Sequence, residues 1–112
     1  RSRLCPHSKN SWPVKPHTFH READEEYAEA AAHYADISPE LGGRFYDEIE
    51  HLIAEACSAP RRYRRIDGDV RRLLAIDFPY ALLYLDEPER VWIVAVMPLK
   101  RDPNYWKHRL PS

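Results

Sequence analysis

Three short apolar segments follow one another in the last third of the chain, and this run constrains the fold more than any other feature. They read VRRLLAIDF, PYALLYLDE and RVWIVAVM, and a proline and the DEPE turn at residues 86–89 mark the breaks between them. Alternation along the first segment places Val70 and Phe78 on the same face. Residues 90–97 are almost wholly apolar, which is typical of a central strand covered on both sides. The sequence therefore predicts three consecutive strands of a mainly antiparallel sheet.

Before these segments, apolar residues recur at steps of three and four, which is the period of an amphipathic helix. One stripe contains Ala23, Tyr27, Ala30, Ala31 and Tyr34, and a second contains Leu41, Phe45, Ile49, Leu52, Ile53 and Ala56. Ser38 and Pro39 supply a cap and a first-turn proline between the stripes, and Pro60 follows the second. We expect two helices joined as an antiparallel hairpin. Gly42 and Gly43 are expected to let the neighbouring helix approach closely.

The N-terminal stretch mixes prolines with basic residues and has no clear period. Residues 1–12 are predicted to be a flexible extension, and residues 13–112 are expected to form one domain. Residues 12–19 alternate loosely, with Val14 and Phe19 as candidate buried positions, and their prolines confine them to an edge strand. The predicted order β-α-α-β-β-β implies an α+β fold, with the helical hairpin on one face of the sheet.

The composition argues against several classes of protein. No apolar run approaches the ~20 residues of a membrane-spanning helix, and no secretory signal is visible, so we expect a cytoplasmic protein. Cys57 lies on a helical apolar stripe and is expected to be a buried free thiol. The histidines have no clustered cysteine or carboxylate partners, so no metal site is expected. Without a glycine-rich phosphate loop or a G-x-S-x-G motif, we also expect no cofactor and no hydrolase triad.

Charge is unevenly distributed along the chain, although the formal net charge is only −1. Residues 1–21 contain five Lys/Arg and no acid, residues 22–55 contain eleven acids and one Arg, and residues 56–112 contain eleven Lys/Arg and seven acids. The basic third includes the run RRYRR at residues 61–65, followed by Gly68 between two aspartates, which predicts a turn. The charges are either solvated faces or a basic surface for nucleic acid or an acidic partner.

Several short motifs recur in a characteristic order. They are Tyr34, Ser38-Pro39-Glu40-Leu41-Gly42, Phe45 and Glu48-Ile49-Glu50 in the helices, then Val70-Arg71-Arg72 and Phe78-Pro79-Tyr80 with Tyr84, and finally Lys100-Arg101-Asp102-Pro103, Tyr105-Trp106 and Arg109. From about Val14 to Arg109 the chain resembles the RelE/ParE family of type II toxin–antitoxin toxins. The resemblance implies a small toxin that a cognate antitoxin holds inactive. The toxin is expected to form either a hetero-oligomer with the antitoxin or a homodimer. RelE-like members cleave mRNA in the ribosomal A site, whereas ParE-like members poison DNA gyrase.

Metal-free RNA cleavage requires proton transfer at the 2′-hydroxyl and the leaving oxygen, together with cations around the phosphate. The candidate catalytic residues are Arg71, Arg72, Lys100, Arg101 and Tyr105. The candidate residues for contact with a target or partner are Arg61, Arg62, Arg64, Arg65 and Arg109. The alternative is that these arginines are surface charge and that Tyr105 and Trp106 fill the core, which we favour for Trp106.

Two departures from the family pattern weigh against a nuclease. Many relatives carry a histidine just after the last strand, where this chain has Pro98. Alignment of the Tyr80–Tyr84 strand with RelE places Ile76 where RelE carries an active-site arginine. The resemblance therefore favours ParE-like gyrase poisoning over RelE-like mRNA cleavage and leaves open whether the chain is an enzyme. A degenerate member that keeps the fold but not the toxicity is the third hypothesis.

Overall fold

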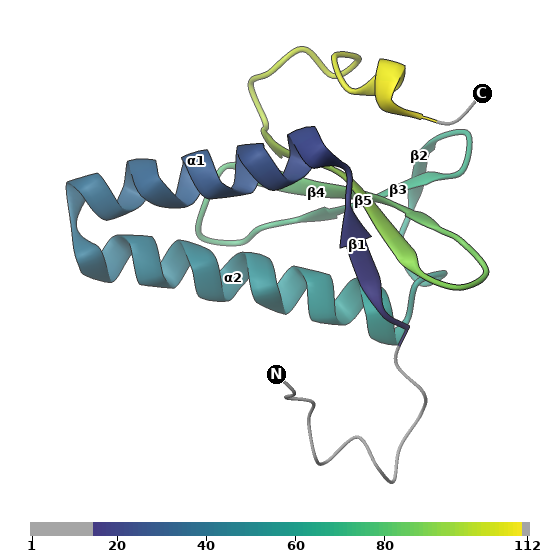
Figure 1. Ribbon diagram of the computed structural model, residues 1–112, viewed down its shortest axis with the longest axis horizontal. Coiled ribbons are helices and arrows are strands. Elements are labelled where there is room, and N and C mark those ends of the chain that lie inside the picture. Colours follow the sequence, from purple (N-terminus) through teal and green to yellow (C-terminus); the bar gives the residue numbers. More distant parts are fainter. Residues whose placement is uncertain (1–14, 111–112) are drawn as a thin grey trace, which may run out of the picture.

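The computed structural model describes residues 15–110 as an α+β domain in which a helical hairpin packs on one face of a sheet (Figure 1). In chain order the elements are β1 (His17–Phe19), α1 (Arg21–Ile37), α2 (Pro39–Ser58), β2 (Arg65–Asp67), β3 (Val70–Leu74), β4 (Tyr80–Asp86), β5 (Val91–Pro98) and the short 3-10 helix η2 (Lys107–Arg109). The α+β prediction is confirmed. The predicted extension at residues 1–12 and the predicted burial of Val14 lie outside the described residues.

A single residue, Ser38, separates the two helices and caps both of them. Its backbone N–H donates to the Tyr34 carbonyl at the end of α1 (3.1 Å), and its Oγ accepts from the Leu41 N–H at the start of α2 (3.0 Å). At the other end of α1, His20 Nδ1 accepts from the Glu22 N–H (3.0 Å). These bonds satisfy backbone groups that helix ends leave without partners. The predicted antiparallel hairpin is confirmed.

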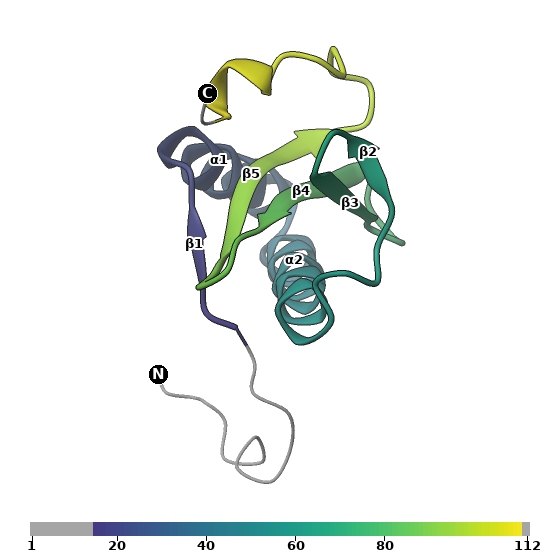
Figure 2. The ribbon, with the colours of Figure 1, turned by 90° about the vertical axis from the view of Figure 1, so that its right-hand side faces the viewer.

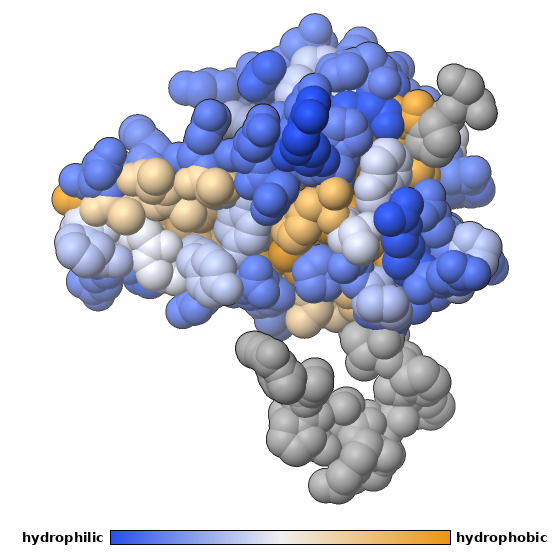
Figure 3. All heavy atoms as spheres, viewed as in Figure 1, coloured by the Kyte–Doolittle hydropathy of each residue, from blue (hydrophilic) through white to orange (hydrophobic). Residues whose placement is uncertain are grey.

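The helices touch most closely at Gly42. A Cβ atom on this residue would lie 2.7 Å from the Cα and Cβ atoms of Ala35, whereas a Cβ atom on Gly43 would meet nothing within 4 Å. The predicted close approach is therefore confirmed for Gly42, and Gly43 plays no part in it. Figure 3 shows that this side of the molecule is mainly hydrophilic, with a weakly apolar band along the alanine-rich α1 and smaller, more strongly apolar patches near the centre and at the upper right of the view.

The sheet has five strands in the order β1-β5-β4-β3-β2, and only β1 runs parallel to its neighbour (Figure 2). The sequence predicted four of these strands, and β2 is the additional one. Arg65 pairs with Arg71, and Gly68, with φ of 56°, makes the tight turn to β3. The expected turn is present, but it belongs to a hairpin that widens the sheet.

The first of the three predicted strands is shorter than expected. β3 ends at Leu74, and the chain turns before β4, where the Ala75 N–H donates to the Tyr80 carbonyl. The placement of Val70 and Phe78 on one face was therefore wrong. Phe78 belongs to the core beneath the helices and Val70 to the core on the other face, because strand alternation does not continue through a turn.

Two hydrophobic cores lie on opposite faces of the sheet. The larger one packs the helical hairpin against the sheet, and the smaller one lies beneath the tail, residues 99–110, around Trp106, which is 1% exposed. β5 contributes to both cores, as predicted for a strand covered on both sides. Cys57 is a buried free thiol as expected, and burial raises its pKa to about 11. Among the helices of residues 15–110, none has the length and apolar content to cross a membrane.

Replacement of Gly42 by alanine should destabilise the fold, whereas the same replacement at Gly43 should not. Because the new methyl group at position 42 would overlap Ala35, we expect Gly42→Ala to lower the free energy of unfolding by about 1–3 kcal/mol. Gly43→Ala should raise it by up to about 1 kcal/mol, because alanine favours a helix more than glycine does. Urea denaturation of both variants measures this difference, and equal effects would contradict the packing described for Gly42.

Candidate functional site

A buried ion pair fastens the tail to α1. The Arg109 side chain is 4% exposed, and its guanidinium donates to both Glu26 carboxylate oxygens (2.7 and 3.1 Å) and to Glu22 (3.1 Å). The Tyr105 hydroxyl also donates to Glu26 (2.6 Å). His108 lies 3.3 Å from Glu22 at the surface. The Glu26 carboxylate thus holds two tail residues that the sequence analysis selected as functional candidates.

The same pair completes the hydrogen bonding of β5. β1 is short and pairs only with Val91, Trp92 and Ile93, so the rest of this edge of β5 has no neighbouring strand within residues 15–110. The Val96 N–H donates to Glu26 (3.1 Å), and the Val94 carbonyl accepts from Arg109 (2.9 Å). The side chains therefore replace the hydrogen bonds that a strand would make to this edge.

These contacts determine what Tyr105 can do chemically. Burial raises the pKa of the phenol, and the hydrogen bond to Glu26 and the negative charge of that carboxylate raise it further, well above its usual range. A neutral phenol whose O–H already donates a hydrogen bond to Glu26 is a poor general base at neutral pH. Its ring is in contact with two cations, because the Arg101 and Arg109 guanidinium groups lie 4.0 and 4.9 Å from its centroid.

The other catalytic candidates divide between the two faces of the sheet. Arg72 is exposed and lies in a row with Leu83 and Ala95, which belong to the face that the tail covers. Its neighbour Arg71 points to the opposite face, because side chains alternate along a strand, and donates to the Tyr63 carbonyl (2.8 Å). Lys100 and Arg101 are exposed where the chain leaves β5. The structure brings Arg101 and Tyr105 into contact and separates Arg71 from Arg72.

The arginine run at residues 61–65 is exposed at the end of the molecule where α2 leads into β2. Arg61 contacts Asp86 (3.3 Å), which also pairs with Lys15, and Arg65 lies 3.5 Å from Asp69. The Arg61, Arg62, Arg64 and Arg65 side chains therefore all reach solvent. Arg109 differs from them, because its guanidinium is buried and engaged within the domain.

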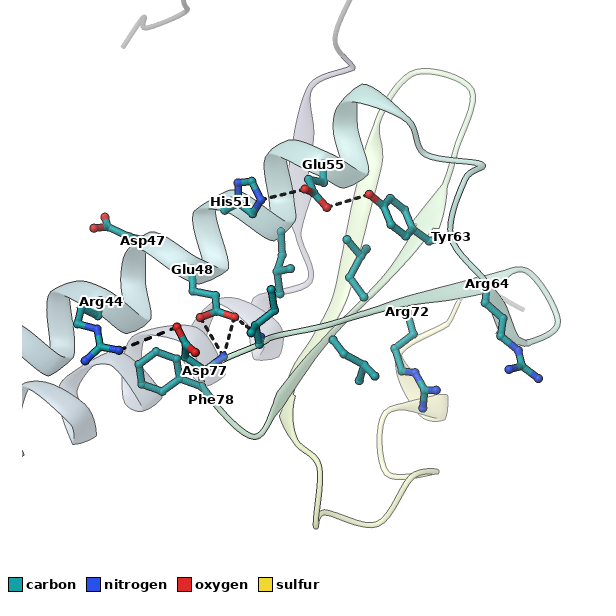
Figure 4. Close-up of a pocket in the computed structure, with 14 residues that line it drawn as sticks. Arg44, Asp47, Glu48, His51, Glu55, Tyr63, Arg64, Arg72, Asp77 and Phe78 are labelled. Atoms are coloured by element: carbon teal, nitrogen blue, oxygen red, sulfur yellow. Dashed lines mark hydrogen bonds and ion pairs between the residues drawn. The ribbon is translucent and has the colours of Figure 1, made fainter.

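A groove of about 720 Å³ lies between α2 and β3, and the sequence analysis did not predict it (Figure 4). Leu52, Leu73 and Phe78 supply its buried apolar surface. Leu74 and Ile76 are 49% and 90% exposed beside it. The sequence carries no specific signal for the groove, because Leu74 and Ile76 lie in a continuous apolar run at residues 73–76 that equally predicts a buried strand.

Carboxylates line the α2 side of the groove, and one of them, Glu48, bonds to the chain just beyond β3 (Figure 4). Glu48 accepts hydrogen bonds from the backbone N–H groups of Ile76 and Asp77. Further along α2, Glu55 accepts from the Tyr63 hydroxyl (2.8 Å) and pairs with His51 (2.9 Å). Within residues 15–110, no cluster of three His, Cys, Asp or Glu side chains could hold a metal ion.

Removal of the Glu26 carboxylate should weaken the attachment of the tail to α1. Glu26→Ala leaves the buried Arg109 guanidinium without its main partner, so we expect the free energy of unfolding to fall by about 3–5 kcal/mol. Glu29→Ala, an exposed change one turn along the same helix, should alter it by less than about 0.5 kcal/mol. Chemical denaturation checks both values. A small effect of Glu26→Ala would show that the tail is held mainly by Trp106.

The comparisons with known proteins point to one fold. No protein-family model matches the sequence, and no match is found among curated proteins. Among solved structures, a chain of the "Chromosomal ParDE TA system from P. aeruginosa" is similar, with a TM-score of 0.66 and 15% identity over 76% of this chain and 96% of that one. The similarity extends over almost all of the other chain, so it concerns the whole architecture of that domain. This protein therefore has a ParE-like toxin fold.

Proposed function

We propose that this protein is the toxin of a type II toxin–antitoxin pair, acting in the cytoplasm and neutralised by a cognate antitoxin. The observation that carries the proposal is the structural similarity to the ParDE chain, which covers 96% of that chain. The ordered motifs from Tyr34 to Arg109 support it independently, because they are a feature of the sequence and not of the backbone.

Within this class we propose ParE-like poisoning of DNA gyrase. The support is chemical, because RNA cleavage requires groups that exchange protons. The Tyr105 hydroxyl donates a hydrogen bond to Glu26, and burial raises the pKa of this phenol. Pro98, at the end of β5, has no ionisable group where many RelE relatives carry a histidine. A toxin that acts by binding does not need these groups.

The exposed cations are the proposed contact surface for the target. Arg72, Lys100 and Arg101 reach solvent at or beside the face covered by the tail, and Arg61, Arg62, Arg64 and Arg65 reach it at the adjoining end of the sheet. Exposed arginines make bidentate contacts with carboxylates and phosphates, so this surface suits either an acidic protein or a nucleic acid. The buried Arg109 is left out of this proposed surface and supports the tail instead.

The first experiment is to add the purified protein to two reconstituted systems. In the first, DNA gyrase acts on supercoiled plasmid, and accumulation of linear, protein-linked DNA is the expected result. In the second, ribosomes translate a defined mRNA, and intact message with normal translation is expected. Cleaved message with unaffected gyrase would overturn the gyrase proposal in favour of the RelE-like one. Inactivity in both systems and no growth defect in cells would favour a degenerate family member.

Arg101 is the residue whose replacement should reduce toxicity with the least structural damage. We expect Arg101→Ala to raise the survival of induced cells about tenfold or more, because one lost charged contact weakens target binding to that extent. Arg21→Ala, an exposed change at the start of α1, is the matched control and should leave toxicity unchanged. Thermal unfolding of both proteins checks that they remain folded. Undiminished killing by Arg101→Ala would remove Arg101 from the proposed surface.

RelE-like mRNA cleavage is the second candidate function. The observation that favours it is the stacking of Arg101 on Tyr105, which places a cation beside an aromatic ring of the kind that stacks on bases. Pro98→His supplies the missing acid–base group and tests this candidate directly. The appearance of ribosome-dependent mRNA cleavage in the variant would identify a decayed nuclease, and its continued absence would exclude loss of this histidine as the explanation.

A further inference from the structure

A second cleft, of about 480 Å³, lies where the β2–β3 hairpin meets the turn between β4 and β5. Both turns lie at the end of the molecule where α2 leads into β2, on the right of Figure 1. Three arginines line this cleft, and each comes from a different segment: Arg61 from the loop after α2, Arg65 from β2 and Arg71 from β3. We call it the arginine cleft. It shares no lining residue with the groove between α2 and β3.

Two of these arginines face each other across neighbouring strands. Arg65 and Arg71 are directly paired in the register of β2 and β3, and both residues line the cleft. Like charges placed directly opposite each other on a sheet are destabilising. An anion bound between the two guanidinium groups would remove this repulsion, so the pairing favours an anion at this position.

Neutral groups hold the Arg71 side chain in place. Its Nη1 donates to the Tyr63 carbonyl (2.8 Å) and to the Arg61 carbonyl (3.3 Å), which both belong to the loop after α2. No ion pair within residues 15–110 involves Arg71. The carbonyls therefore fix the guanidinium without neutralising its charge, and its other N–H groups can donate to a ligand.

Two of the acids that line the cleft are paired with cations from outside it. Asp86, whose side chain is 10% exposed, accepts from Lys15 and also contacts Arg61 (3.3 Å). Glu87 accepts from Arg90 (2.6 Å). Because Lys15 and Arg90 do not line the cleft, they offset its carboxylates and leave positive charge on the lining arginines.

The third acid forms only a weak pair at the surface. Arg65 lies 3.5 Å from Asp69, and the two side chains are 60% and 87% exposed. Exposed ion pairs of this kind contribute little to stability, because water and salt screen them. The Arg65 side chain can therefore leave Asp69 for a ligand at little cost.

We propose that the arginine cleft binds one backbone phosphate of a nucleic acid. One guanidinium fork in a single plane satisfies a carboxylate, whereas the oxygens of a phosphate group point in several directions and accept from several donors. Guanidinium groups from three segments therefore suit a phosphate. That the nucleic acid is the DNA on which gyrase acts rests on the proposed function, whereas the phosphate site does not.

The surroundings of the cleft favour a chain of phosphates over a free phosphate ion. Arg62 and Arg64 are exposed in the same loop as Arg61 and do not line the cleft. They extend the positive surface beyond it, where the phosphates next to the bound one can reach them. A single ion has no use for these charges. Because the contact is with the backbone, it positions the nucleic acid without reading its sequence.

Removal of the Arg71 guanidinium should weaken the binding of DNA. The probe is a fluorescein-labelled duplex of about 20 base pairs, and fluorescence anisotropy measures its affinity for the full chain over a range of salt concentrations. We expect Arg71→Gln to weaken binding about fivefold near physiological salt and to lower the slope of log affinity against log salt by about one. Arg21→Gln removes the same charge at the start of α1 and should weaken binding less than about twofold. Equal effects of the two changes would overturn the proposal.

Further variants separate binding from folding, because Arg71 also bonds to the loop after α2. Circular dichroism and thermal unfolding verify the fold. If Arg71→Gln does not fold, Arg65→Gln carries the same prediction, because this side chain is largely exposed. Arg71→Lys keeps the charge but not the fork, so it should restore the salt slope while its affinity stays below that of the wild type. A lysine variant with the slope and affinity of Arg71→Gln would show a purely structural role and overturn the proposal.

Two other probes test the alternative occupants. Inorganic phosphate and a hexaglutamate peptide are each titrated into the protein, and NMR follows the Nε–H signals of Arg65 and Arg71. We expect the duplex to bind at least about tenfold more tightly than either probe. Equal affinities for inorganic phosphate and DNA would identify a free anion as the ligand. Tighter binding of hexaglutamate than of DNA would identify an acidic protein, and either result would overturn the proposal.

The DNA assays require neither gyrase nor a toxic effect, so the two proposals fail separately. DNA binding that depends on Arg71, in a protein that harms neither gyrase nor cells, rejects only the proposed function. Poisoning of gyrase by a toxin whose Arg71→Gln variant binds DNA as tightly as the wild type rejects only the phosphate site.

Discussion

The packing of the tail and one edge of the sheet both depend on the carboxylate of Glu26. β1 is only three residues long and leaves part of one edge of β5 without a neighbouring strand within residues 15–110. Glu26 and Arg109 reach this edge from α1 and from the tail and supply the missing donor and acceptor. The same pair, with Tyr105, holds the tail over the second core. One buried ion pair therefore completes a sheet edge and fastens a segment nearly a chain length away.

This arrangement gives structural roles to residue types that suggest catalysis. Tyr105 and Arg109 have the chemistry of a phosphate-handling site, but their hydrogen bonds are made within the domain. Arg72, Lys100 and Arg101, by contrast, carry their charge into solvent. The division matters for function because exposed charge suits recognition of a large target, whereas catalysis also requires a group that can exchange a proton.

The two edges of the sheet are treated differently. Beyond β1, the outer side of β5 is sealed by side chains from the domain's own helix and tail. At the other edge, β2 covers the start of β3 and Glu48 caps the backbone just after its end, which leaves Leu74 between them. Unpaired strand edges attract other strands, so a protein that closes one edge and leaves a short, charge-flanked opening in the other restricts what can add there.

Periodicity and local capping chemistry in the sequence were enough to predict the helical hairpin, the central apolar strand and the α+β class. These signals act over a few residues, so they can be recognised in the sequence without coordinates. They are Ser38 with Pro39, the apolar stripes of α1 and α2, and the apolar run of β5. The tertiary structure alone decided the rest. β2 depends on pairing with β3, Phe78 on a turn that interrupts the alternation, and Arg109 on a carboxylate 83 residues away. Burial of a charge depends on which distant group comes to face it, and no local pattern carries that information.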